Sequence, residues 1–377
     1  MYIKQAQLEN LGKALIPNKA VIIYGPRRCG KTTLLKKFLE TAQEKYILAS
    51  GEDITIQDYL ASCSVEKLKS FIGENRLLVI DEAQKIPRIG LNIKLLLDHR
   101  EGLKVIATGS SSFDLAKDTG EPLTGRKFTL RLFPLAQLEL CAIESRAETA
   151  AHLEERLIYG SYPEVVIADD NSFRQQYLRE LTGSYLYKDI LELDGLRHND
   201  KLIRLLQLLA FQLGGQVSLH ELGAQVGMSK NTVERYLELL ENAFVIFKVR
   251  GFSRNLRKEI TKSCRYYFYD TGVRNAVISN FNPLRLRNDT GMLWENYCVA
   301  ERVKKQEYRQ ILSNNYFWRT YDRKEIDWVE ERGGALHGYE IKWSAAKKTK
   351  PPKDWLVAYP GSQYECISPE NYLEFIA

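Results

Sequence analysis

An apolar segment near the start of the chain runs into a glycine-rich stretch, a lysine and two threonines, a spacing suited to phosphate chemistry. The segment is 21–24, and the residues that follow are Gly25, Pro26, Arg27, Arg28, Cys29, Gly30, Lys31, Thr32 and Thr33. Glycines at both ends of this loop allow tight turns and a close approach to phosphate, and the first amide groups of the following helix point toward the anion. In this pattern Lys31 meets the β- and γ-phosphates, and the hydroxyl of Thr32 ligates Mg²⁺. The segment 25–33 is therefore predicted to hold a nucleoside triphosphate with magnesium.

A second apolar segment, 77–80, ends in the carboxylates of Asp81 and Glu82. A continuous apolar run of this length is typical of a strand that is buried on both faces of a parallel sheet. Phosphoryl transfer requires one group that holds Mg²⁺ and another that polarises the attacking water. We assign the first role to Asp81, acting through water, and the second role to Glu82. The alternative, an acid pair that only caps a strand-to-helix turn, accounts for the chemistry of neither residue.

Two more residues stand where the phosphates of a bound nucleotide could be sensed. A third strand is expected at 104–109, and Ser110 follows it, where the carboxyl edge of a sheet would face the ligand. Ser110 is a candidate sensor or, equally, the N-cap of a helix that begins near Phe113. Arg126 precedes an alternating strand at 128–132, and its guanidinium could reach a γ-phosphate bound to its own chain or to a neighbouring chain. An ordinary surface arginine is the alternative there.

The composition is typical of a soluble globular chain with two or three domains. Of the 377 residues, 44% are hydrophobic and 27% are charged, which leaves ample material for separate cores. No apolar run approaches the length of a membrane span, and the first residues lack the apolar core of a signal peptide, so a cytoplasmic location without membrane contact is expected. The six cysteines include no C-x-x-C pair, which predicts free thiols. Oriented amides around Cys29 are expected to lower the pKa of its thiol.

The middle of the chain has the pattern of a helix-turn-helix followed by a basic hairpin. Apolar residues recur at helical spacing in 201–209, a short helix is expected to begin at the Ser218 cap, and another is expected at the Ser229 cap after a glycine turn. Apolar strands at 243–249 and 266–269 would form the wing. The net charge of +6 is mild, but basic residues cluster around a single acid between these strands, at Arg250, Arg254, Arg257, Lys258, Lys262 and Arg265. This cluster predicts salt-sensitive contact with a nucleic acid backbone, although winged helices also serve as protein scaffolds.

Three alternating strands are expected near the end of the chain, at 316–320, 325–329 and 339–343. A two-residue turn at 333–334 would join the second and third strands as a hairpin. Centring the turn there places Asp327 opposite Glu340 and Trp328 opposite Tyr339. Because side chains alternate across a strand, the two acids would share one face. The other face would form the core, with Ile326, Trp328, Tyr339 and Ile341.

The acidic face of this hairpin has the residue types of a metal site. Directly opposed residues have Cβ atoms about 4.5–5.5 Å apart, so Asp327 and Glu340 could chelate one divalent cation. Lys342, one pleat along, could orient a water or stabilise a pentacovalent phosphate. Glu295, on an amphipathic helix that opens near Leu293, could supply a further ligand. The alternative is an ordinary surface hairpin with solvated cross-strand charge pairs.

The order of these motifs resembles a family of bacterial and archaeal AAA-like ATPases whose C-terminal region of unknown function is similar to PD-(D/E)xK restriction-endonuclease-like domains. The resemblance rests on Gly-Pro-Arg-x-x-Gly-Lys-Thr-Thr, Val-Ile-Asp-Glu-Ala-Gln, Gly-Ser-Ser, Leu-Thr-Gly-Arg, Gly-Ser-Tyr-Pro-Glu-Val-Val and Phe-Tyr-Asp-Thr-Gly, and it covers nearly the whole chain. It implies ATP binding by 25–33 and hydrolysis assisted by Asp81 and Glu82. It also implies that Asp327, Glu340 and Lys342 match the nuclease pattern Asp…Glu-x-Lys.

We therefore expect an α/β protein with a P-loop NTPase parallel sheet. Four domains are expected: an AAA-like ATPase core, a helical lid, a winged helix-turn-helix and a restriction-endonuclease-like domain, at 1–135, 136–197, 198–275 and 276–377. The expected function is ATP hydrolysis with Mg²⁺, coupled to DNA or RNA engagement, with phosphodiester cleavage by the C-terminal domain. The alternative is an ATP-dependent signalling switch or protein-binding scaffold whose nuclease-like domain is catalytically idle. A homo-oligomer is required if Arg126 acts on a neighbouring chain.

Overall fold

The chain folds into two compact units, which we describe separately in this computed structural model. The first unit comprises the chain up to Pro134 together with Asn242–Phe244, and the second comprises Leu135–Glu241 and Val245–Ala377. The structure describes residues 2–110, 123–186, 199–253, 264–320, 322, 324–344 and 349–377. The last three domains expected from the sequence fall within the second unit, except for residues 242–244 of the expected winged helix.

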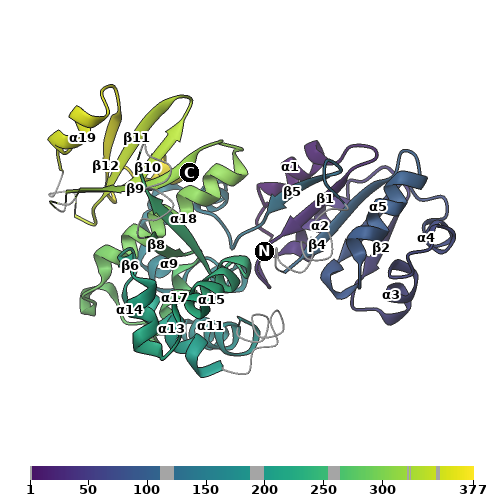
Figure 1. Cartoon of the computed structure of the whole chain (residues 1–377), viewed down its shortest axis with the longest axis horizontal. Helices are drawn as coiled ribbons and strands as arrows, with labels where there is room; N and C mark the ends of the chain where they lie inside the picture. The colour runs from purple at the N-terminus through teal and green to yellow at the C-terminus, as the bar shows by residue number, and fades with distance from the viewer. Residues whose placement is uncertain are drawn as a thin grey trace. The chain divides into compact units, whose positions relative to one another are not determined.

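A five-stranded parallel sheet forms the centre of the first unit (Figure 1). Its order is β2-β3-β4-β1-β5, so that β4 lies between the strand before the phosphate loop and the strand that ends in the acid pair. Strands β1, β3 and β4 are almost entirely buried, as continuous apolar strands of a parallel sheet should be. Because all five strands are parallel, their carboxyl ends meet at one edge. The strands are β1 Ala20–Tyr24, β2 Tyr46–Ser50, β3 Leu77–Asp81, β4 Lys104–Gly109 and β5 Lys127–Arg131.

The helices of the first unit bury the apolar side chains of this sheet. On one face, Val21 and Ile23 of β1 share a core cluster with Leu34 of α2 and Leu11 of α1. The intervening residue of β1, Ile22, is also buried, so both faces of the strand are covered. The helices are α1 Gln7–Ala14, α2 Lys31–Leu39, α3 Ile54–Leu60, α4 Val65–Ile72, the 3₁₀ turn η1 Ala83–Lys85, and α5 Ile89–His99.

The second unit contains a seven-stranded mixed sheet in the order β12-β11-β10-β9-β7-β8-β6. Strands β7 and β8 pair antiparallel, as the sequence predicted for the hairpin. The other edge of β7 pairs in parallel with β9, so this hairpin is continuous with the C-terminal strands and is not a free wing. The strands are β6 Gln216–Val217, β7 Ile246–Gly251, β8 Cys264–Phe268, β9 Asn314–Arg319, β10 Glu325–Arg332, β11 Ala335–Ile341 and β12 Gln363–Ile367.

The helix-turn-helix segment starts and ends at residues with clear physical roles. Ser218 caps α14, since its hydroxyl accepts a hydrogen bond from the amide of Glu221 at 3.3 Å. Gly227 ends the helix in the left-handed region with φ of 65°, which glycine adopts without strain. A Cβ added at Gly223 would lie 2.6 Å from the carbonyl oxygen of Met228, so glycine also permits the tight turn into the next helix.

The remaining elements of the second unit are mostly helical. Helix α18 lies beside the sheet, and α9, α11, α13 and α17 pack against one another. The helices are α7 Gln137–Leu140, α8 Arg146–Ala151, α9 Leu153–Tyr159, α10 Pro163–Val166, α11 Asn171–Glu180, η2 Leu181–Leu186, α13 Asn199–Phe211, α14 Leu219–Val226, α15 Lys230–Asn242, α17 Thr271–Val277, η3 Leu284–Leu286, α18 Thr290–Tyr308, α19 Lys353–Ala358 and α20 Tyr372–Ile376.

Buried polar contacts join the motif around Gly160 to the motif around Asp270. The Gly160 amide that caps α9 donates to the Arg156 carbonyl, and α17 supplies further donors to the last carbonyl groups of this helix. The Thr271 hydroxyl donates to the Arg156 carbonyl at 2.7 Å, and the Asn275 amide donates to the carbonyls of Leu157 and Ile158. Asp270 accepts a 2.7 Å hydrogen bond from the amide of Ser161. These contacts explain why two motifs that are far apart in the sequence occur together.

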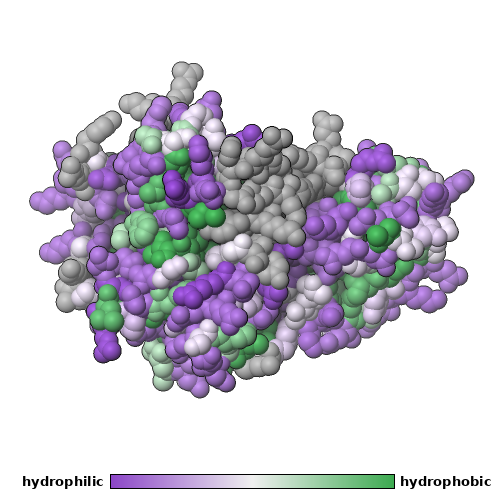
Figure 2. Space-filling view, turned by 90° about the horizontal axis from the view of Figure 1, so that it is seen from below, coloured by the Kyte–Doolittle hydropathy of each residue, from purple (hydrophilic) through white to green (hydrophobic). Residues whose placement is uncertain are grey.

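The surface is mostly hydrophilic on the face shown in Figure 2, with small groups of hydrophobic residues between the polar ones. Scattered exposed apolar residues of this kind are normal on globular proteins. Within the described ranges, none of the helices combines the length and the apolar character that crossing a membrane requires.

We expect Gly272→Ala to destabilise the second unit by about 2–3 kcal/mol, because the new Cβ would lie 2.0 Å from the carbonyl oxygen of Tyr159. The matched control is Gly291→Ala in the first turn of α18, where nothing lies within 4 Å of the new Cβ. That control should be neutral or slightly stabilising, by about 0.5 kcal/mol. Urea unfolding followed by circular dichroism measures both, and equal midpoints for the two variants would contradict the packing argument.

Candidate nucleotide-binding site

The loop at 25–30 joins β1 to α2 at the carboxyl edge of the first sheet. A Cβ added at Gly25 would lie 2.1 Å from the carbonyl oxygen of Leu132, so only glycine lets the loop pass this closely. Gly30 is the N-cap of α2 with φ of 101°, a left-handed conformation that side chains rarely adopt. Arg28 also has a positive φ, of 62°. Residues with positive φ, placed among residues with ordinary backbone angles, turn successive amides toward one side and make a concave anion site.

Lys31 folds back over this loop. Its ammonium nitrogen donates to the carbonyl oxygens of Gly25 and Pro26 at 2.9 and 3.0 Å, and the residue is 5% exposed. An ammonium has three donors, so two of them hold the loop and one remains for an anion. The positive charge therefore lies where the sequence pattern predicts contact with phosphate.

A chain of hydrogen bonds joins the start of α2 to the ends of β3 and β4. The Thr32 hydroxyl donates to Asp81 Oδ2 at 2.7 Å, and the Thr108 hydroxyl donates to Asp81 Oδ1 at 2.5 Å. Thr108 is fully buried, whereas Thr32 is exposed and Asp81 is partly exposed. A hydroxyl and a carboxylate oxygen in direct contact are a donor set that suits Mg²⁺. The structure thus brings together the two residues that the sequence assigned to magnesium.

Glu82 and Ser110 are also neighbours, through a residue that the sequence argument did not single out. The Gln84 side-chain amide donates to Glu82 Oε2 at 2.5 Å and to the Ser110 hydroxyl at 3.1 Å. Glu82 has φ of 51°, and its backbone amide donates to the Thr108 hydroxyl at 3.0 Å. The sequence contained a signal for both of the residues that were missed. Gln84 ends the Asp-Glu-Ala-Gln motif, and Thr108 is the penultimate residue of an expected strand.

The environment of Cys29 differs from the sequence-based expectation. Its thiol is fully buried, and this burial raises the pKa of Cys29, although oriented amides and Lys31 act in the opposite direction. The expectation of a lowered pKa was therefore wrong.

The sequence analysis did not predict the role of Gln5. Its side chain donates to the carbonyls of Cys29 and Gly30, at 3.4 Å each, and no motif in the N-terminal segment indicated this contact.

Arg126 lies at the opposite edge of the sheet from the phosphate loop. It precedes Lys127, which pairs with Ala20 at the amino end of β1, whereas the loop begins after Tyr24. Five residues of strand separate the two positions, roughly 16 Å at about 3.3 Å per residue. The guanidinium instead forms an ion pair with Asp98. Arg126 therefore does not approach the loop of its own chain. An action on a neighbouring chain and an ordinary surface arginine remain from the alternatives.

In the second unit, the expected C-terminal side chains cluster around a buried arginine from β8. Arg265 Nη1 lies 3.4 Å from Glu295 Oε1 and 3.5 Å from Asp327 Oδ1, and Nη2 lies 2.9 Å from Glu325 Oε2. Lys342 Nζ lies 2.5 Å from Glu340 Oε1 and 3.7 Å from Asp327 Oδ2. Within the described part of the chain, no group of three or more His, Cys, Asp and Glu side chains is arranged to hold a metal ion.

The hairpin register agrees with the sequence prediction, and Lys342 contacts both Asp327 and Glu340, as expected for side chains on one face. The assignment of Ile326 and Trp328 to one core face does not agree. Trp328 pairs with Tyr339, and Gly333 and Gly334 form the turn. However, β10 has an irregularity between Ile326 and Val329, and these two residues share one core cluster although they are three positions apart. Trp328 belongs to a different environment, where its indole donates to Glu330 Oε1 at 2.9 Å. Simple alternation was wrong here because a bulge shifts the pleat by one residue.

Burial and mutual repulsion raise the acid pKa values in this cluster. Burial, followed by the Asp327 carboxylate, raises the pKa of Glu295 to about 8 and that of Glu340 to about 7. Burial alone would lower the pKa of Lys342. The carboxylates of Asp327 and Glu340 outweigh burial and hold this pKa above its usual value. Glu295 and Glu340 are thus partly protonated near neutral pH, while Arg265 and Lys342 stay charged.

The basic segment expected to contact nucleic acid is only partly described. Arg250 is exposed at the end of β7. Arg265 is 3% exposed and is engaged by the acid cluster, so its assignment as a backbone contact was wrong. The neighbouring residues in the sequence gave no warning of this, since the acids that contact Arg265 come from α18 and β10. The remaining four positions, Arg254, Arg257, Lys258 and Lys262, lie outside the described residues.

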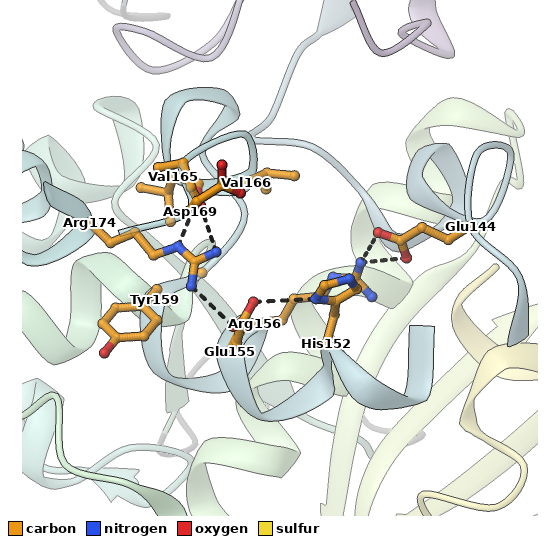
Figure 3. A pocket seen from close by; sticks show the side chains of 11 residues that line it. Glu144, His152, Glu155, Arg156, Tyr159, Val165, Val166, Asp169 and Arg174 are labelled. Carbon is orange, nitrogen blue, oxygen red and sulfur yellow. Dashed lines mark hydrogen bonds and ion pairs between the residues drawn. The ribbon is translucent and has the colours of Figure 1, made fainter. Parts of the chain in front are cut away.

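A cavity of about 110 Å³ in the helical part of the second unit is lined by none of the predicted site residues (Figure 3). Arg156 points toward Glu144 and forms an ion pair with it. Arg174 points toward Glu155 at 3.2 Å and also donates to the carbonyls of Val165 and Ala168. The donors of both arginines are thus engaged within the fold, which indicates a structural role.

Comparison with known proteins finds a family that is similar to the first unit. Residues 17–141 match the model of a family described as an AAA domain. This part of the chain is similar to AAA domains, and its parallel sheet is consistent with a P-loop NTPase. Residues 150–284 and 290–367 match two families described as domains of unknown function, DUF8612 and DUF4143, and neither description names a nuclease.

Relatives with similar sequences extend over most of the chain. An uncharacterized protein of Mycobacterium tuberculosis is 26% identical over 337 residues, which cover 88% of this chain and 72% of the relative. An uncharacterized protein of Methanocaldococcus jannaschii is 26% identical over 338 residues, which cover 84% of this chain and 73% of the relative. A structure of Bacteroides Pif1 bound to ssDNA covers 48% of this chain and 50% of that chain, with a TM-score of 0.25 and 15% identity. At that TM-score the likeness carries no argument about fold or function.

Glu295→Gln should reduce the pH dependence of stability. The raised pKa of about 8 means that the folded protein holds a proton which the unfolded chain releases above about pH 4.5. The contribution of the protonated Glu295 to stability is complete below the pKa that this group has in the unfolded chain. It is lost as the pH rises toward 8. Glutamine is neutral and keeps an acceptor for the Tyr267 hydroxyl, which donates to Glu295 at 2.7 Å. Relative to wild type, the variant should gain a few kcal/mol between about pH 5 and about pH 8.

Urea unfolding at a series of pH values measures this difference. Glu331→Gln is the control, because Glu331 is an exposed acid on β10, the strand that carries Asp327. The control should keep the wild-type slope of stability against pH. If Glu295→Gln also kept that slope, Glu295 would not be a buried acid with a raised pKa.

Proposed function

We propose that this protein binds ATP with Mg²⁺ at 25–33 and hydrolyses it. One observation carries the proposal: Thr32, directly after the loop lysine, shares a 2.7 Å hydrogen bond with Asp81 at the end of β3. Magnesium coordination and phosphate binding would then occupy adjoining positions at the carboxyl edge of one parallel sheet. The match of residues 17–141 to an AAA domain supports the same chemistry.

Each residue at this edge has a specific role in the proposal. Loop amides at 25–33 and the Lys31 ammonium bind and orient the phosphates, and Thr32 and Asp81 hold Mg²⁺, which neutralises charge that develops on the phosphates. Glu82 accepts a hydrogen bond from the attacking water and orients it. The Gln84 amide, which donates to both Glu82 and Ser110, positions this carboxylate and leaves its second oxygen for water. Ser110 would sense the γ-phosphate through the same amide.

Two substitutions separate binding from hydrolysis. Lys31→Ala should weaken ATP binding and abolish turnover, since it removes the cation at the phosphates. Glu82→Gln should retain ATP binding and lower the rate of hydrolysis by about a hundredfold or more, since it removes the group that polarises water. Phosphate release and fluorescent-nucleotide titration measure the two effects. Glu66→Gln, an exposed acid on α4, is the control. ATP hydrolysis that survives both site variants would sink the proposal.

We further propose that the nucleotide state is coupled to DNA or RNA engagement through the basic segment that follows β7. Five of its six expected basic residues remain candidates, because Arg250 is exposed and four others lie outside the described residues. The chain also returns to the first unit between α15 and β7, where the Phe244 ring lies 6.3 Å from that of Phe133. That covalent connection is a route by which the nucleotide site could influence the segment.

The triple variant Arg254→Ala, Arg257→Ala and Lys258→Ala tests this coupling. DNA or RNA should stimulate ATP hydrolysis by the wild-type protein, and the triple variant should lose this stimulation and keep its basal turnover. The stimulation should also fall as salt is raised, because backbone contacts release counterions. A control with the same change of charge replaces the exposed residues Arg309, Lys350 and Lys353 by alanine. Equal stimulation in both triple variants would disconnect the basic segment from the ATPase.

A second candidate function is a nucleotide-dependent switch or protein-binding scaffold whose C-terminal domain cleaves nothing. The observation that favours it over phosphodiester cleavage is the guanidinium of Arg265 among the acids of the nuclease-like pattern. In either case, a role for Arg126 at a nucleotide would require a second copy of the chain.

A further inference from the structure

Three carboxylates and two cationic side chains lie together in the second unit, between α18 and the sheet. Arg265, Asp327 and Glu340 are buried, and Glu295 and Lys342 are partly exposed. Glu295 comes from α18, Asp327 from β10 and Glu340 from β11, while Arg265 comes from β8. Arg265, Asp327 and Glu340 are 3%, 3% and 6% exposed. Buried charges are stable only when they are paired and hydrogen-bonded, so the arrangement of these pairs determines what the cluster can do.

The Arg265 guanidinium takes the central position among the acids. Its two terminal nitrogens contact three carboxylates, those of Glu295, Asp327 and Glu325, at 2.9–3.5 Å. Its plane also lies over the Phe317 ring, with 4.7 Å from the guanidinium carbon to the ring centroid. A planar fork of donors that stacks on an aromatic ring suits contact with several carboxylates at once, which a lysine could not match.

The oxygens that a metal would need already have donors. Glu295 Oε1 accepts from the Tyr267 hydroxyl at 2.7 Å in addition to Arg265. Asp327 Oδ2 accepts from the backbone amide of Ile341 at 3.0 Å and faces Lys342. Glu340 Oε2 is a buried oxygen without a hydrogen-bond partner in the described part of the chain, and one such oxygen beside two cations does not make a cation site.

We propose that Arg265 takes the place of a divalent cation, so that the C-terminal acid cluster is a metal-free ion-pair centre joining β8, β10 and α18. The residues present do not fit Mg²⁺ or Mn²⁺, because a metal ion at Asp327 would face the guanidinium on one side and the Lys342 ammonium on the other. Removing the guanidinium would leave Lys342 as the cation beside the three carboxylates. A divalent cation that bound there would supply the missing positive charge and displace the protons that burial holds on Glu295 and Glu340. This inference deepens the second candidate function and does not rest on ATP hydrolysis.

Mn²⁺ binding to the full chain without nucleotide tests the proposal, with free Mn²⁺ measured by electron paramagnetic resonance. We count only the Mn²⁺ binding that disappears when the substitution Asp327→Asn is added. This criterion excludes any metal held near Asp81. Wild type should show no such binding with a Kd below about 1 mM. Arg265→Ala should gain one Asp327-dependent site with a Kd at least about tenfold lower. Because the measurement omits nucleotide, its failure is distinguishable from failure of the proposed ATPase.

Arg302→Ala is the matched control. Its guanidinium is also buried, and it donates to a single acid, Glu330, at 2.6 and 2.8 Å. Removal of this cation should therefore create no Mn²⁺ site. If Arg265→Ala fails to fold by circular dichroism, Arg265→Gln, which keeps a polar side chain, replaces it.

Three results would overturn the proposal. The first is Asp327-dependent Mn²⁺ binding by wild type, and the second is DNA cleavage by wild type with Mn²⁺ that Asp327→Asn abolishes. Neither requires an Arg265 variant to fold. The third is a folded Arg265 variant that gains no site, since the guanidinium would then not be what excludes the metal.

Discussion

The parallel register of β1, β4 and β3 is the constraint on which the nucleotide site depends. Because the three strands run in one direction, the loop after β1, Thr108 near the end of β4 and Asp81 at the end of β3 arrive at the same edge. Thr108 then bridges the two neighbouring residues of the acid pair, since it donates to the Asp81 carboxylate and accepts from the Glu82 amide. A shift in this register would separate the residues assigned to the metal from the residue assigned to water.

Local patterns in the sequence predicted the parts of the structure that depend on neighbouring residues. Continuous apolar runs gave β1, β3 and β4 within one residue of their observed bounds, because burial on both faces leaves few polar positions in such a strand. The glycine pair at 333–334 likewise fixed the register of Trp328 against Tyr339, because a two-residue turn allows one pairing. The Ser218 cap marked the start of α14 for a similar local reason.

Contacts between distant segments could not be predicted in this way. Arg265 stands in a basic stretch, and nothing near it in the sequence indicates that carboxylates from α18 and β10 surround it. The edge at which Arg126 lies depends on the direction of β5 relative to β1, which alternation alone does not specify. The bulge between Ile326 and Val329 reflects packing against the core rather than a breaker residue, so the face of Trp328 was assigned incorrectly.

The two polar groups of residues differ in a way that separates a ligand site from a structural centre. At the nucleotide site, Thr32 is exposed and Asp81 is partly exposed, so water can replace their mutual hydrogen bond when a ligand enters. In the acid cluster, Asp327 is 3% exposed and its partners are cations from the same chain. Breaking such a buried pair leaves an uncompensated charge that costs about 3–5 kcal/mol, whereas an exposed pair costs little to exchange. The same carboxylate chemistry therefore favours ligand exchange in the first unit and a fixed arrangement of strands in the second.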